Sequence, residues 1–93
     1  MDKHRIRRTI LDTVKYFDPV AASIEDIHSY PGVAAAGITL DQVQSAVLDL
    51  ISYGFLRNLM PGWGMALRLT PEGRAQIERD APLDERVWGE LAL

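Results

Sequence analysis

The stretch from Leu56 to Glu78 reads LRNLMPGWGMALRLTPEGRAQIE and decides the fold. Two runs rich in apolar residues, FLRNLM at residues 55–60 and MALRLT at residues 65–70, flank the glycine-containing sequence PGWG. Strand-length apolar runs that are joined by a short glycine-containing loop are typical of a β-hairpin. Residues 55–70 are therefore predicted to form two antiparallel strands.

A helix is predicted directly after this hairpin. Thr70 is a good N-cap, because its hydroxyl can accept a hydrogen bond from a backbone N–H of the first turn. Pro71 would take the first helical position, where its missing N–H costs nothing, and Glu72 complements the positive end of the helix dipole. The helix is expected to run from about Thr70 to about Arg79.

A longer helix is predicted at the start of the chain, over residues 2–17. Asp18-Pro19 ends it, because a residue before proline is pushed away from the α conformation. Its apolar residues recur at the spacing of one helix face, and they are Ile6, Ile10, Leu11, Val14 and Phe17. The basic residues are expected on the other faces, in solvent or paired with the acidic tail, and they are Lys3, Arg5, Arg7, Arg8 and Lys15.

Two further helices are predicted between residues 23 and 54. Ser23 is a candidate N-cap for a short helix that Pro31-Gly32 ends, and residues 32–38, GVAAAGI, are predicted to be a connector. Thr39 and Gln42 form a capping box that opens the longer helix, and Gly54 ends it in a left-handed conformation. The predicted buried stripe of this longer helix is Leu40, Val43, Ala46, Val47, Leu50 and Ile51.

The composition describes a small folded protein. Its 93 residues make one domain, and 47% hydrophobic with 25% charged residues excludes a wholly disordered chain. The absence of cysteine excludes disulfides, thiolate zinc sites and thiol catalysis. No run of about 18 apolar residues is present, so we expect no membrane span and a cytoplasmic location.

The predicted order of elements resembles the winged helix-turn-helix superfamily. GFLR at residues 54–57 followed by LRLTPEGR at residues 67–74 is similar to the Leu-Thr-x-x-Gly that ends the wing in small MarR-like and PadR-like bacterial regulators. The resemblance covers about residues 5–79. It implies a mainly α fold with a small β-hairpin, in which a three-helix core carries a wing, a fourth helix and a helical C-terminal tail.

This resemblance implies two regions and a DNA-binding function. Residues 1–79 would be the winged-helix domain, and residues 80–93 a helical tail that packs on the domain or on a dimer mate. Double-stranded DNA would receive the longer helix in its major groove, and the wing, with residues 61–64 at its tip, would lie along the backbone or minor groove. A symmetric homodimer would form through the first helix and the tail. The expected contacts are base edges for Gln42, Gln44 and Ser45, and phosphates for Arg57 and Arg68.

The charge distribution favours an alternative. Residues 16–56 contain five acidic residues and neither lysine nor arginine, although the whole chain has a net charge of only −3. Phosphate neutralisation supplies most non-specific DNA affinity, and Asp49 would meet phosphates on the outward face of the longer helix. That face is expected to consist of Asp41, Gln44, Ser45, Leu48, Asp49 and Ser52. The alternative is a winged helix that serves as a protein-interaction or assembly module and does not bind DNA.

Two tryptophans and Leu48 are the candidate partner-binding residues of this alternative. Trp63 has three interpretations: a packing cap on Met60 or Met65, a stacking contact with nucleic acid, or an anchor in a partner's pocket. Trp88 either covers the domain's own core or a dimer interface, or binds a different partner. The sequence leaves these interpretations open.

No catalytic, metal or cofactor site is predicted. His4 and His28 have no second ligand at a spacing that suits a metal, and there is no cysteine nearby. The chain has no Gly-x-Ser-x-Gly motif and no glycine-rich phosphate loop. We therefore expect that this protein is not an enzyme.

Overall fold

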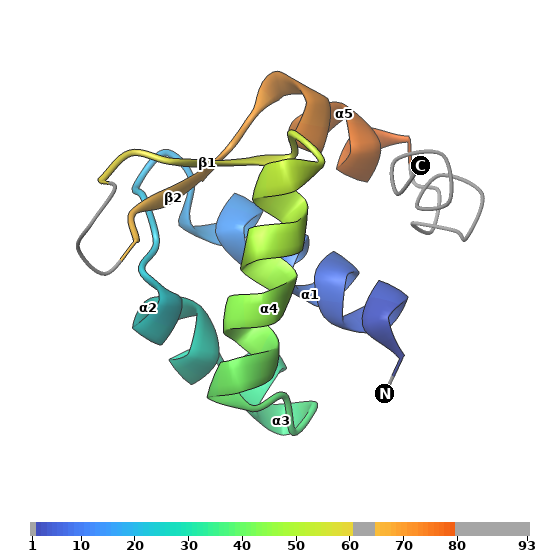
Figure 1. Ribbon diagram of the computed structural model, residues 1–93, viewed down its shortest axis with the longest axis vertical. Helices are drawn as coiled ribbons and strands as arrows, with labels where there is room; N and C mark the ends of the chain where they lie inside the picture. The colour runs from blue at the N-terminus through green and yellow to red at the C-terminus, as the bar shows by residue number, and fades with distance from the viewer. Residues whose placement is uncertain (1, 61–64, 80–93) are drawn as a thin grey trace.

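The computed structural model describes residues 2–60 and 65–79. Within these ranges the chain forms five helices and one antiparallel hairpin (Figure 1). The elements are α1 (Lys3–Phe17), α2 (Ile24–Ser29), α3 (Pro31–Ala35), α4 (Leu40–Ser52), β1 (Leu56–Asn58), β2 (Leu67–Leu69) and α5 (Pro71–Glu78). The predicted fold class, mainly α with a small β-hairpin, is confirmed.

The core lies where α1 crosses α4 in the middle of the molecule, with α2 and the hairpin closing its sides (Figure 1). The apolar face predicted for the first helix is confirmed, because Ile6, Ile10, Leu11 and Val14 are all buried. Burial of each such side chain contributes about 1.5–3 kcal/mol. The other large members of this core are Ile24, Ile27, Val33, Ile38, Val43, Val47, Leu50, Phe55, Leu56, Leu67 and Ile77.

The hairpin pairs Leu56 with Leu69 and Asn58 with Leu67. Its strands are three residues long, shorter than the runs from which they were predicted. Ala22, in the connection between α1 and α2, forms a further antiparallel bridge with Leu67, and the two residues exchange backbone hydrogen bonds of 2.8 and 3.0 Å. This bridge attaches β2, at the end where it pairs with Asn58, to the connection between α1 and α2.

The prediction of a connector over residues 32–38 is wrong. Pro31 does not simply end α2, because it is also the first residue of α3. A proline fits that position, where its fixed φ suits the helix and no N–H is needed. Val33 then fixes this short helix to the core by complete burial.

The start predicted for the last helix is confirmed. The Thr70 hydroxyl accepts a hydrogen bond from the Gly73 N–H at 3.0 Å and donates one to the Gly54 carbonyl. Pro71 occupies the first turn, and Glu72 is the acidic residue in it. The Thr70 side chain therefore links the start of α5 to the end of α4.

Several predictions concern residues outside the described ranges. These are the wing tip at residues 61–64 with Trp63, and the tail at residues 80–93 with Trp88. Among the residues that the structure describes, no helix is both long and apolar enough to cross a membrane.

Candidate nucleic-acid interface

The helix predicted to read DNA, α4, is fixed at both ends. At its start, the Thr39 hydroxyl accepts from the Gln42 N–H at 3.2 Å, and the Gln42 Oε1 accepts from the Thr39 N–H at 2.9 Å. At its end, Gly54 has a φ of 81°, and the Phe55 N–H donates to the Leu50 carbonyl at 2.9 Å. Both predicted signals, the capping box and the left-handed glycine, are confirmed.

The buried face of α4 is narrower than predicted. Val43, Ala46, Val47 and Leu50 are buried, as expected. Leu40, however, is 40% exposed, because it is the first residue of the helix and extends past the edge of the core. Ile51 is only half-buried.

The outward face of α4 presents four exposed side chains that were predicted for it, besides the acidic Asp41. They are Gln44, Ser45, Leu48 and Ser52. Leu48 is 55% exposed, which makes it a large apolar side chain in the middle of a polar surface.

The position of Asp49 corrects two predictions, one about Asp49 itself and one about Arg7. Its Oδ2 accepts a hydrogen bond from the Arg7 Nη2 at 2.6 Å, in an ion pair between α4 and α1. Arg7 was expected on a solvent-facing side of the first helix, but it is only 8% exposed. Arg7 lies one helical turn after Lys3 and shares a helix face with Val14, which comes seven residues later. Its guanidinium also lies over the Tyr53 ring, 5.5 Å from the centroid.

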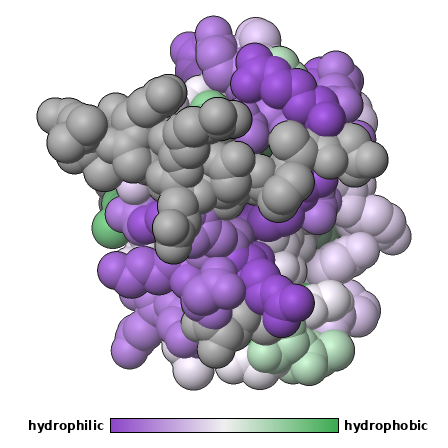
Figure 2. All heavy atoms as spheres, turned by 90° about the vertical axis from the view of Figure 1, so that its right-hand side faces the viewer, coloured by the Kyte–Doolittle hydropathy of each residue, from purple (hydrophilic) through white to green (hydrophobic). Residues whose placement is uncertain are grey.

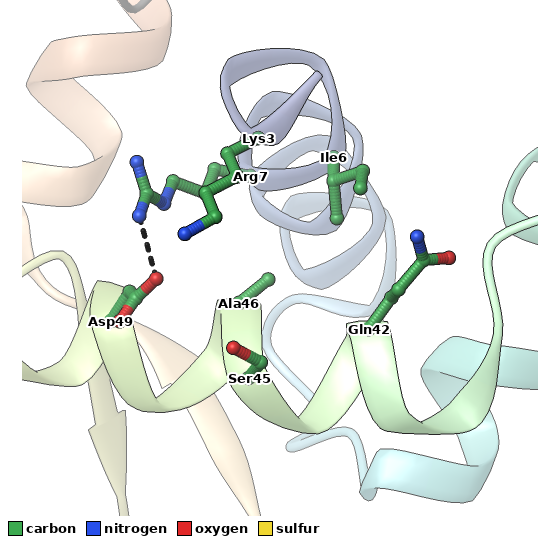
Figure 3. Close-up of a pocket in the computed structure, with 7 residues that line it drawn as sticks. All are labelled: Lys3, Ile6, Arg7, Gln42, Ser45, Ala46 and Asp49. Atoms are coloured by element: carbon green, nitrogen blue, oxygen red, sulfur yellow. Dashed lines mark hydrogen bonds and ion pairs between the residues drawn. The ribbon is translucent and has the colours of Figure 1, made fainter. Parts of the chain in front are cut away.

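An open pocket lies beside this ion pair, between the first turns of α1 and residues 42–49 of α4 (Figure 3). Ile6 and Ala46 supply its apolar surface, and both are buried. Lys3 and Arg7 extend from α1 toward α4, whereas Ser45 lies on the opposite wall. The other two lining residues are Gln42 and Asp49. The first helix therefore brings positive charge directly beside the predicted reading helix, which the family resemblance did not lead us to expect.

The remaining basic residues of α1 point elsewhere. Figure 2 looks at the side of the molecule on which α1 begins, and hydrophilic side chains cover most of its described surface. Arg5 and Lys15 are exposed, and Arg8 pairs with Asp12 at 3.3 Å, one turn away on the same helix. Arg5 and Lys15 are therefore solvent-facing, as predicted, whereas Arg8 is half-buried.

The hairpin arginines lie directly opposite each other, Arg57 on β1 and Arg68 on β2. Like charges in that position repel each other. Asp18, the residue that ends α1, offsets this repulsion: its carboxylate accepts from Arg68 at 3.4 Å and from Arg74 of α5 at 2.8 Å. The hydrogen bond from Arg74, followed by that from Arg68, holds the pKa of Asp18 below its ordinary value.

The structure therefore separates the predicted DNA contacts into two groups. Gln42 and Ser45 lie together at the pocket beside Arg7, with Gln44 on the neighbouring surface of α4. Arg57 and Arg68 lie on the hairpin, where Arg68 already has a carboxylate partner.

Sequence reasoning missed the positions of Lys3, at the pocket, and of Asp18, between two arginines. The spacing of Lys3 and Arg7, one turn apart and in line with Val14, was the available signal for the α1 face. No local pattern pointed to Asp18, because its partners lie 50 and 56 positions away. Within the described residues, no three side chains of His, Asp and Glu gather where they would hold a metal ion.

No protein-family model, no curated protein and no solved structure matches this chain. Its function must therefore be argued from the site itself.

Proposed function

We propose that this chain is a DNA-binding winged-helix transcriptional regulator in which α4 enters the major groove. The observation that supports this proposal most directly is the ion pair of Arg7 with Asp49. The strongest physical objection to DNA binding is a carboxylate of α4 that faces phosphates. Because Arg7 pairs with that carboxylate at 2.6 Å, the two charges offset each other before DNA arrives.

The arrangement of α4 supports the same proposal. The helix is capped at both ends, and among the described residues it exposes Gln44, Ser45 and Leu48 on its outward face. Figure 1 shows α4 in front of α1. Gln44 has an amide that suits adenine, Ser45 has a hydroxyl that can donate or accept, and Leu48 can contact a thymine methyl group. Lys3 stands beside this face and supplies a cation for the DNA backbone.

The hairpin supplies a second set of phosphate contacts in this proposal. Arg57 is exposed on β1 and can reach a phosphate without giving up an ion pair within the described residues. Arg68 would have to share its guanidinium between a phosphate and Asp18. A symmetric dimer through α1 and residues 80–93 would place two such domains on neighbouring half-sites.

Fluorescence anisotropy of a labelled mixed-sequence duplex tests this proposal. We expect binding at about 50 mM salt that weakens steeply by about 200 mM salt, as phosphate-driven binding does. Lys3→Gln should reduce the dependence on salt by about one phosphate contact, whereas Lys15→Gln, the same change on the outer face of α1, should not. The absence of binding at about 50 mM salt would contradict the proposal.

A second candidate function is a docking module for another protein. It is favoured by exposed apolar side chains on α4 and next to β1: Leu40, Leu48, Leu59 and Met60. Leu59 and Met60 are 45% and 55% exposed, as large apolar residues at docking surfaces often are. With a second copy of this chain as the partner tested, Leu48→Gln should then lower self-association in sedimentation experiments, and the anisotropy titration should show no DNA binding. Unchanged association in Leu48→Gln would contradict docking through α4.

A further inference from the structure

A cluster of charged side chains lies at the hairpin, and the function proposed above uses only part of it. Arg57 on β1 lies directly opposite Arg68 on β2. Asp18, which follows α1, accepts hydrogen bonds through separate oxygens, Oδ1 from Arg68 at 3.4 Å and Oδ2 from Arg74 of α5 at 2.8 Å. We call these four residues the hairpin cluster. Three positive charges against one negative charge leave it with an excess of positive charge.

The arginines of the hairpin cluster face solvent. Neighbouring residues of a strand point to opposite faces, and Leu56 and Leu67, each next to one of the hairpin arginines, are buried in the core. Arg57 is exposed, and the side chains of Arg68 and Arg74 are 43% and 42% exposed. Figure 1 shows α5 and the hairpin at the end of the molecule where α4 ends. A ligand in solvent can therefore approach arginines from three elements.

The hairpin cluster has more hydrogen-bond donors than its own carboxylate uses. Asp18 accepts only from the Nη2 atoms of Arg68 and Arg74, so each guanidinium keeps further N–H groups for another anion. Arg57 forms no ion pair with any residue in the described part of the chain. The Asp18 side chain is 23% exposed and therefore less accessible than the two guanidinium groups that it holds. Phosphate oxygens suit the remaining donors, because a guanidinium can bind two of them at once.

We infer that Arg74 of α5 joins the two hairpin arginines in binding the phosphate backbone of DNA, and that Asp18 competes with the phosphates for Arg68 and Arg74. This inference rests on the proposed DNA-binding function and adds a contact from α5 to it. A phosphate beside these guanidinium groups is attracted by them and repelled by the Asp18 carboxylate. The same ion pairs that stabilise the fold therefore lower the affinity for DNA.

The role of Arg74 is tested by the salt dependence of the anisotropy titration, with the full chain folded at the titration temperature. Arg74→Gln should reduce the slope of log affinity against log salt by about one phosphate contact. Arg74→Lys should retain most of that slope, because it keeps the charge. Arg79→Gln is the matched control on the same helix, where Arg79 is exposed and donates to Gln76. It should leave the slope unchanged.

The competition by Asp18 predicts a gain of affinity. Asp18→Asn should tighten DNA binding about fivefold at about 50 mM salt, because it removes a negative charge beside the phosphates. Asp12→Asn is the matched control, since it removes a carboxylate that pairs with Arg8 elsewhere on α1. This second change should alter the affinity less than twofold, by about the effect of one distant charge.

A double variant separates direct binding by Arg74 from an effect through Asp18. Arg74→Gln also lets Asp18 pair more closely with Arg68, which by itself would weaken DNA binding. In a chain with Asp18→Asn this indirect effect is absent, so adding Arg74→Gln should still weaken binding if Arg74 contacts DNA. Equal affinity of Asp18→Asn and of the double variant would contradict that contact. The double variant removes both partners of the ion pair, which a fold tolerates better than the loss of one.

A titration with tripolyphosphate tests the anion site without DNA. We expect saturable shifts of the arginine Nε–Hε signals of Arg57, Arg68 and Arg74 in NMR spectra of the ¹⁵N-labelled full chain, and none with sodium chloride of equal ionic strength. Tripolyphosphate binding without DNA binding would refute the proposed function and retain only the anion site. DNA binding with unchanged slope in Arg74→Gln, or with no gain in Asp18→Asn, would overturn this inference and retain the proposed function. Binding of neither would overturn both.

Discussion

Gly73 lies so close to Phe55 that a β-carbon at position 73 would fall 2.2 Å from the Phe55 carbonyl oxygen. The same carbonyl accepts a hydrogen bond from the Thr70 N–H at 3.2 Å. The first turn of α5 therefore packs directly on the backbone that leads into β1. This contact gives a physical reason for the glycine in the sequence LTPEG.

Gly73→Ala should accordingly destabilise the protein, because a backbone carbonyl cannot turn aside as a flexible side chain can. We expect a loss of about 2–3 kcal/mol in the free energy of unfolding, measured by urea denaturation. Gly32→Ala is the matched control, because its β-carbon would meet only ring carbons of Tyr30, the nearest at 3.1 Å. Equal stability of Gly73→Ala and the wild-type chain would contradict the packing of α5 on Phe55.

The register of α4 predicts opposite outcomes for two neighbouring substitutions. Val47 is fully buried, so Val47→Asp places an unpaired charge in the core and should unfold the domain. Leu48 is exposed, so Leu48→Asp should retain a cooperative melt in circular dichroism. A folded Val47→Asp protein would mean that the register is wrong.

The ion pair of Arg7 and Asp49 should contribute to stability. Asp49→Asn leaves a mostly buried guanidinium without this carboxylate, and we expect a cost of about 1–2 kcal/mol, since Asp49 itself is partly exposed. A double-mutant cycle with Arg7→Met isolates the interaction energy. The exposed pair of Arg8 with Asp12 is the comparison, for which about 0.3–0.5 kcal/mol is expected. If the interaction energy of the Arg7–Asp49 pair is no larger than that of the Arg8–Asp12 pair, the expected contribution of the Arg7–Asp49 pair to stability is contradicted.

Asp18 should make the stability depend on pH in the acidic range. Its pKa is held below the ordinary value of 3.8 by Arg74 and then Arg68, so the folded state binds its proton less readily than the unfolded state. The stabilisation is therefore fully present above that value and is lost as the pH falls through the lower, folded-state pKa.

The measurement is the unfolding free energy of the wild-type chain and of Asp18→Asn between neutral and strongly acidic pH. We expect the difference between them to shrink on acidification. The pKa of Asp2 is also lowered, chiefly by its hydrogen bond from the Arg5 N–H, but both proteins share this contribution and it cancels. A difference that does not change with pH would exclude the Asp18 cluster as its source.

Local signals in the sequence were sufficient for most of the fold. The capping roles of Thr39 with Gln42, of Gly54 and of Thr70 depend on residues close in sequence, so they can be read without tertiary structure. The hydrogen bond from Thr70 to the Gly54 carbonyl, 16 positions away, cannot. Pro31 was misjudged because the same residue can follow one helix and begin the next. Here the burial of Val33 decided between the two, and that depends on the rest of the core.

The candidate site was less accessible from sequence. Gln44, Ser45 and Leu48 were correctly placed on the outward face of α4, because helical periodicity determines it. The partner of Asp49 was not predictable, because Arg7 lies 42 positions away and only the crossing of two helices brings them together. The same crossing places Lys3 beside Ser45.

The cluster around Asp18 also bears on how the chain can be divided. One carboxylate joins the end of α1, strand β2 and helix α5, which are far apart in the sequence. A fragment that stops at Leu69 would lack Arg74, which pairs with Asp18, and Gly73, which packs on the Phe55 backbone. We therefore expect such a fragment to be prone to proteolysis, and a separate peptide that supplies α5 to restore its protection. Helix α5, the last helix that the structure describes, is therefore expected to hold the domain together rather than to be a dispensable addition to it.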